Sequence, residues 1–245
     1  MRKNSKLNVF GDSYATPELC VDVNNSFWGK LAKDLGVGSV DNYSHPGFSL
    51  DHIIHLLLNE EFDFAEDYFV IGIPPLIRYM AYSDNVPKPW YKKTYSSLDA
   101  QPEEMLIESL SNTQKFTFEE QFANDKKAIT KFNSEWNDVQ CLEKIYLLHQ
   151  YLTLKQAKFI IVNLSVPVHY QDLWPAGKNI MIKVNQLPEC IIFDNTYYSV
   201  NYNDGIKPAD FDQYSWMGHH GPEGNINWYN KKIRPKIKEL GWIDA

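Results

Sequence analysis

The sequence predicts an α/β protein with a mainly parallel sheet. Over the first 75 of its 245 residues, short apolar runs of strand length alternate with stretches whose apolar residues recur every three or four positions. This alternation is typical of βαβ units, in which helices connect parallel strands. The runs at 68–73 and 158–163 are apolar almost throughout, which indicates strands that are covered on both faces.

The first three elements are expected within the first 44 residues. A strand at 7–10 ends at a glycine, and a helix follows the N-cap candidates Asn25 and Ser26. Gly36 or Gly38 can end that helix, because glycine tolerates the left-handed conformation of a helix C-terminus. A weaker strand is expected at 41–44.

A second helix and a buried strand complete the predicted βαβαβ pattern. Ser49 can cap the helix, whose apolar residues form one stripe at positions 50, 53, 54, 57 and 58. The strand at 68–73 ends at Pro74-Pro75, since proline has no N–H to donate to a sheet.

The second half of the chain is predicted to contain an insertion, followed by further strands and helices of the α/β core. Residues 78–137 lack a clear period and are interpreted as an insertion or lid with one or two short helices. A helix over about 142–152, strands at 158–163 and 190–193, and a last helix that starts near Pro222 follow. We therefore expect one domain over residues 1–245.

Composition excludes several classes of function. The net charge of −7 disfavours binding to nucleic acid, and no apolar run is long enough to cross a membrane. The basic start leads into only four apolar-rich residues, too few for a secretory signal, so we expect a cytoplasmic protein, or a virion-associated one if it is viral. The three cysteines are widely spaced, and neither a metal-binding cluster nor a glycine-rich phosphate loop occurs, so no metal or cofactor is expected.

The clearest candidate for chemistry is the tripeptide Gly11-Asp12-Ser13. It follows the first predicted strand, at the edge where open α/β sheets bind their ligands. Gly11 permits a tight turn, and the Ser13 hydroxyl is a potential nucleophile. Asp12 is expected to hold the loop through hydrogen bonds, because a carboxylate beside the nucleophile would oppose formation of an oxyanion.

A histidine near the other end of the chain can serve as the base. His220 lies just before the last predicted helix, in a loop that can reach the same edge of the sheet, and the adjacent His219 is a weaker alternative. With Gly11-Asp12-Ser13, and with Gly224 four residues after His220, the chain resembles the SGNH/GDSL hydrolase family.

The resemblance implies a three-layer α/β/α sandwich with a flavodoxin-like sheet and a serine hydrolase that cleaves an ester, an O-acetyl ester of a glycan being one candidate. It implies Ser13 as nucleophile, His220 as general base, and the N–H groups of Ser13 and Gly47 as an oxyanion hole. Such a protein would bind a small ester or an acylated glycan as its partner, without nucleic acid or membrane.

Two positions depart from the family pattern. Pro74 replaces the asparagine that donates to the oxyanion, a role that Arg78 or Asn163 could fill from a nearby loop. Met217 replaces the aspartate that orients the histidine, and Asp212 is the nearest upstream acid. The alternative to an enzyme is therefore a catalytically impaired binding or structural module on the same fold, such as a viral one.

Overall fold

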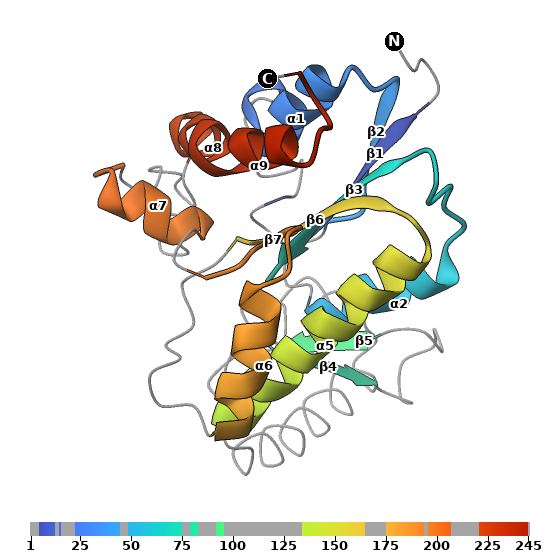
Figure 1. Ribbon diagram of the computed structural model, residues 1–245, viewed down its shortest axis with the longest axis vertical. Coiled ribbons are helices and arrows are strands. Elements are labelled where there is room, and N and C mark those ends of the chain that lie inside the picture. Colours follow the sequence, from blue (N-terminus) through green and yellow to red (C-terminus); the bar gives the residue numbers. More distant parts are fainter. Residues whose placement is uncertain are drawn as a thin grey trace, which may run out of the picture.

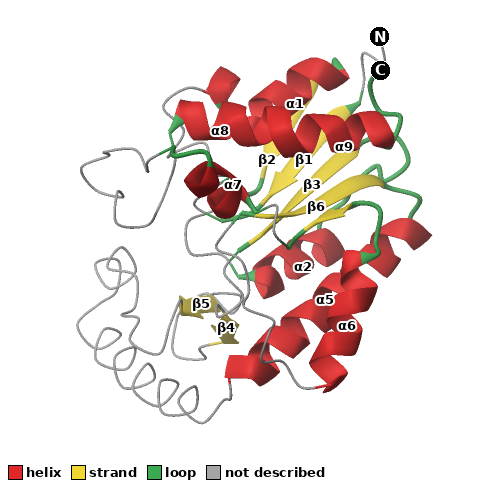
Figure 2. Ribbon diagram, turned by 60° about the vertical axis from the view of Figure 1, so that its left-hand side comes forward, coloured by secondary structure: helices red, strands yellow, loops and turns green. Residues whose placement is uncertain are grey.

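The computed structural model describes residues 5–12, 15, 23–44, 49–74, 79–82, 92–95, 134–164, 175–193, 196–206 and 221–244. These residues form a central sheet with helices on both faces, as Figures 1 and 2 show.

The central sheet has five parallel strands in the order β2-β1-β3-β6-β7. They are β1 (Lys6–Phe10), β2 (Ser39–Asn42), β3 (Tyr68–Ile73), β6 (Lys158–Asn163) and β7 (Cys190–Ile191). This is the flavodoxin-like order, in which the chain reverses its direction of winding between β1 and β3. The predicted parallel sheet is confirmed.

Helices cover the two faces of the sheet and complete three layers (Figure 2). One face carries α1 (Phe27–Leu35), α7 (Tyr197–Asn203), α8 (Pro222–Trp228), a π turn at Tyr229–Ile233 and α9 (Arg234–Glu239). The other face carries α2 (Leu50–Asn59), α5 (Ser134–Leu154) and α6 (Pro175–Asn185). The α/β/α sandwich that the sequence predicts is therefore present.

Each layer of helices has its own hydrophobic core. Successive residues of a strand point to opposite faces, so Val70 packs with α1 and α8, while Phe69 and Ile71 pack with α2 and α5. In β6, Ile160 and Ile161 divide between the two clusters in the same way. The central strands contribute apolar side chains to both cores, which explains their nearly continuous apolar sequence.

The predicted helix starts have identifiable caps. Ser26 Oγ accepts a hydrogen bond from the Gly29 N–H at 2.9 Å, and Gly36, with φ of 65°, ends α1. At the start of α2, the Ser49 N–H donates to His52 Nδ1 at 3.2 Å, so histidine fills the role that glutamate usually has in a capping box.

Several elements differ from the expectation. The second strand, β2, lies two residues earlier than predicted, because Asn42 Oδ1 accepts from the Ser44 N–H at 2.8 Å and turns the chain there. The predicted strand at 190–193 is shortened to two residues. Helices α6 and α7 occupy segments for which the sequence predicts no helix.

The predicted insertion contains strands as well. β4 (Tyr79–Tyr82) and β5 (Lys92–Tyr95) pair antiparallel, and α5 begins at Ser134, before the expected end of the insertion at 137. The short helices that we expect in the remainder of the insertion fall outside the described residues.

Candidate functional site

The end of β1 forms a tight turn at the edge of the sheet. The Ala15 N–H donates to the Asp12 carbonyl oxygen at 3.0 Å, the pairing of a four-residue β-turn. Asp12 is fully buried. In the sequence, Ser13 falls between the two partners of this bond, and Ser13 itself lies outside the described residues.

Side chains packed at this edge leave no room for a Cβ atom at two glycines. A Cβ atom on Gly11 would lie 2.8 Å from Ala15 Cβ and 3.2 Å from Leu164 Cδ1. A Cβ atom on Gly72 would overlap Leu164 Cδ1 and lie 3.0 Å from the Phe10 carbonyl oxygen. Leu164, which follows β6 and is fully buried, therefore fills the space between the ends of β1 and β3.

The segment after β2 is tied to the turn after β1. Asn42 Nδ2 donates to the Ala15 carbonyl oxygen at 2.9 Å. Ser44 Oγ is buried, lies 3.5 Å from a Cβ position on Gly11, and has no hydrogen-bond partner within the described part of the chain. Both residues fall in the strand expected at 41–44, and neither is expected at the site, although asparagine is a typical turn residue. Gly47 lies outside the described residues.

The start of α8 is anchored by Asn225, which has 6% of its surface exposed. Its Oδ1 accepts from the Phe27 N–H of α1 at 3.2 Å. Its Nδ2 is 3.3 Å from the Tyr197 hydroxyl oxygen and 3.2 Å from the Gly221 carbonyl oxygen, and it donates to both. Asn225 thus holds the N-cap of α8 against α1. His220, which immediately precedes Gly221, lies outside the described residues, as does Asp212.

Tyr197 is part of the core and not of an open binding surface. Only 2% of it is exposed, and its ring meets Trp228 edge to face at a centroid distance of 5.4 Å. The pair of tyrosines at 197–198 would suit an aromatic lining for a ligand, and burial excludes that role for the first of the two.

The ends of β3 and β6 lie side by side, next to Pro74. Ile73 and Asn163 are register partners, and the next residue, Pro74, is buried and has no N–H. Asn163 is 1% exposed, and its Nδ2 donates to the Ile192 carbonyl oxygen at 3.1 Å. Its side chain therefore connects β6 to the residue after β7. Arg78, the other suggested donor, lies outside the described residues.

Cysteine and metal chemistry find no support among the residues that the structure describes. Cys141 and Cys190 form no disulfide within the described residues, and burial raises the pKa of Cys190, with a smaller contribution from the charge of Glu189. That thiol therefore stays protonated at neutral pH. No group of three or more potential metal ligands occurs in this part of the chain. No helix in it combines the length and the apolar character needed to cross a bilayer.

Comparison with known proteins shows similarity of structure alone. No family model and no curated protein matches the sequence. The lipase Lip_vut3 from a goat rumen metagenome superimposes with a TM-score of 0.49 and 12% identity, over 98% of this chain and 99% of the lipase. The acetyl xylan esterase Est2A from Butyrivibrio proteoclasticus superimposes with a TM-score of 0.48 and 12% identity, over 98% of this chain and 66% of the esterase. A member of the lipolytic G-D-S-L family from Veillonella parvula superimposes with a TM-score of 0.45 and 10% identity, over 96% of this chain and 97% of that protein.

Proposed function

We propose that the protein is a serine hydrolase of the SGNH/GDSL type that cleaves an ester through an acyl-enzyme on Ser13. One observation carries the proposal: the hydrogen bonds of Asn225 join the cap of α8 to the start of α1. The candidate base His220 directly precedes that cap, and the candidate nucleophile Ser13 lies in the connection from β1 to α1. We therefore propose that the two residues meet at the carboxyl edge of the sheet, where open α/β sheets bind their ligands.

The proposed reaction has two halves. The Ser13 hydroxyl attacks the acyl carbonyl while His220 takes its proton, and the N–H groups of Ser13 and Gly47 stabilise the oxyanion. The C–O bond of the ester then breaks, and the alcohol leaves with the proton from His220. Water, deprotonated by His220, attacks the acyl-enzyme and releases the carboxylic acid and free Ser13.

The third oxyanion donor and the acid that orients the base come from positions other than those of the family pattern. Loss of one oxyanion donor costs on the order of 3 kcal/mol of transition-state stabilisation, and Pro74 cannot supply it. Of the two candidates, Asn163 is buried and its Nδ2 already donates to the Ile192 carbonyl oxygen, so we assign this role to Arg78. Asp212 is proposed to orient His220 in place of the residue at Met217. The substrates that fit are small esters, including acetyl groups on a glycan.

A binding module is the second candidate function, and the buried Pro74 favours it. Without a third donor the site could bind an acylated ligand and turn it over slowly or not at all. In such a module, the hydrogen bond of Asp12 would still stabilise the turn after β1, and Leu164 would still pack against Gly11 and Gly72.

Labelling of the nucleophile tests the proposal. The protein is treated with a fluorescent fluorophosphonate, and hydrolysis of 4-nitrophenyl acetate is measured in parallel. We expect labelling and turnover in the wild type, neither in Ser13→Ala, and a strong loss of both in His220→Gln. Ser39→Ala, at the exposed start of β2, is the matched serine control and should behave as wild type. A wild-type protein that is neither labelled nor active would leave the binding module as the better-supported function.

A further inference from the structure

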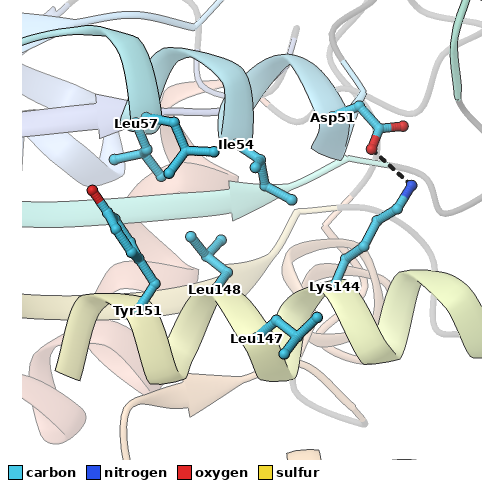
Figure 3. Close-up of a pocket in the computed structure, with 8 residues that line it drawn as sticks. Asp51, Ile54, Leu57, Lys144, Leu147, Leu148 and Tyr151 are labelled. Atoms are coloured by element: carbon cyan, nitrogen blue, oxygen red, sulfur yellow. Dashed lines mark ion pairs between the residues drawn. The ribbon is translucent and has the colours of Figure 1, made fainter. Parts of the chain in front are cut away.

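A pocket of about 350 Å³ lies between α2 and α5. Figure 3 shows Ile54 and Leu57 of α2 on one side of the space between the helices and Leu148 and Tyr151 of α5 on the other, with Leu147 beside them on α5. Nothing in the proposed ester hydrolysis uses these residues.

The pocket arises from helical spacing on two facing helices. Positions 54, 57 and 58 of α2 and positions 147, 148 and 151 of α5 each fall on one face of their helix. Leu57 and Leu148 are nearly fully buried, whereas Leu58 and Leu147 are 59% and 65% exposed. Exposed leucines are ordinary singly, but two of them on the rim of one apolar hollow indicate a site for an apolar ligand.

The charges at one end of the pocket select the ligand's polar group. Among the described residues that line it, only Asp51 and Lys144 are charged, and their ion pair of 2.7 Å closes that end (Figure 3). An anionic head group would be attracted to Lys144 but repelled by Asp51, and a cationic one the reverse, so an ion gains little net attraction there and still loses its hydration. An uncharged hydroxyl or ester avoids both repulsions, and it can accept a hydrogen bond because an ammonium carries three N–H donors.

The dimensions of the pocket suit a single hydrocarbon chain. From Lys144 to Tyr151 the pocket extends along two turns of helix, about 10 Å. Its volume is at the low end of small-molecule pockets, which range over about 300–1000 Å³. A hydrocarbon chain fits inside such a space, whereas an α-helix, about 10–12 Å across, could insert only side chains of one face into it.

We propose that the α2–α5 pocket binds the aliphatic chain of an uncharged amphiphile, such as a fatty alcohol or fatty ester, with its polar head beside Asp51 and Lys144. This binding goes beyond the proposed hydrolysis and does not require Ser13.

Calorimetric titration of the full-length protein with 1-hexanol, 1-octanol and 1-decanol, below their solubility limits, tests the ligand class. We expect saturable binding of one molecule, with affinity rising about fourfold for each added methylene group until the chain outgrows the pocket. Decanoate and decyltrimethylammonium should bind more weakly than 1-decanol. Absence of saturable binding, or tighter binding of either ion, would overturn the proposal.

Variants locate the site. Leu147→Asp and Leu58→Asp should each weaken 1-decanol binding at least tenfold, because each puts a charge on the pocket rim. Leu154→Asp is the matched control, since Leu154 is 83% exposed on the same helix and does not line the pocket. Ser13→Ala should bind as wild type, and loss of binding there would place the ligand at the β1 edge. If the wild type is a dimer that Leu147→Asp dissociates, the pocket is an interface between copies and the proposal fails.

Discussion

At the edge of the sheet, Gly72 is a residue whose surroundings leave no room for a side chain. Its missing side chain makes room for Leu164, and a Cβ atom there would meet that side chain and the Phe10 carbonyl oxygen. We expect Gly72→Ala to lower the free energy of unfolding by about 1–3 kcal/mol, the usual cost of overpacking a core. Urea unfolding of the wild type and the variant measures this loss. In a double-mutant cycle, the variant that carries both Gly72→Ala and Leu164→Ala should lose less stability than the sum of the two single losses. A loss equal to that sum would show that Leu164 is not the obstacle.

Asn225 is the residue that links the two ends of the candidate site. Asn225→Ala leaves the buried Phe27 N–H without its side-chain acceptor, so we expect a loss of about 1–3 kcal/mol in the free energy of unfolding. If His220 is the base, kcat should also fall more than KM rises, because the cap beside His220 loses its anchor. Asn185→Ala, at the exposed end of α6, is the control and should change stability by less than about 0.5 kcal/mol. An unchanged kcat in a folded Asn225→Ala protein would show that this anchor does not position the base.

Local chemistry decides which site residues can be predicted from sequence. The turn at Gly11-Asp12 and the proline start of α8 depend on residues next to one another, and both are present as expected. Asn225 could not be found in this way, because its partner Phe27 is 198 positions away. Ser13, His220, Gly47, Asp212 and Arg78 stay predictions.

Among the elements, the π turn after α8 binds the last helical segment to α1. Pro235 cannot donate a hydrogen bond, and the preceding Arg234 N–H bonds to the Tyr229 carbonyl oxygen, five residues back. The Tyr229 hydroxyl donates to Asp34 Oδ2 at 2.7 Å, and Arg234 Nε donates to the same oxygen at 2.9 Å. One carboxylate of α1 therefore holds both ends of the π turn.

This contact predicts a loss of stability at alkaline pH. Burial, the hydrogen bond to Asp34 and the charge of Asp34 raise the pKa of Tyr229 above its ordinary value of 10.0. Folding therefore favours the protonated phenol, so this stabilisation is complete below pH 10 and is lost as the pH rises above it. Tyr229→Phe should reduce the fall in the free energy of unfolding between about pH 10 and 11, measured by urea unfolding. Tyr202→Phe, 69% exposed on α7, should leave the fall unchanged, and an equal effect of both variants would contradict the role of Tyr229.

Elements with a strong period or a cap could be predicted, and the others depend on distant contacts. Helix α1 has a capping serine and a terminal glycine within its own sequence. Helix α7 reads Tyr-Tyr-Ser-Val-Asn-Tyr-Asn, which has no apolar stripe, and it is stabilised by the Thr196 cap and by burial of Tyr197 and Val200. Strand β2 is only partly buried, so its apolar pattern does not mark its ends.

At the scale of the whole molecule, the three layers could be predicted but the strand order could not be derived from the periods alone. Continuous apolar strands require cover on both faces, and the two hydrophobic clusters provide it. The order of the strands depends on pairings such as Ile73 with Asn163, 90 positions apart, which no local pattern encodes. The flavodoxin-like order is expected from the family resemblance, and it is the order that the structure has.

The expected single-domain organisation predicts that the insertion can be removed without loss of the fold. Within the described part of the chain, the members of both clusters lie at positions up to 73 and from 139 onward, and the crossover from β3 to β6 is completed by α5, which begins at Ser134. Replacing residues 79–132 with a Gly/Ser linker of about eight residues should therefore leave a cooperative urea transition and a dispersed amide NMR spectrum. A linker of about sixteen residues is the control for strain at the junction, because doubling a flexible loop costs only about 0.6 kcal/mol. If neither variant unfolds cooperatively, the insertion is part of the core and the boundary at 78–137 is wrong.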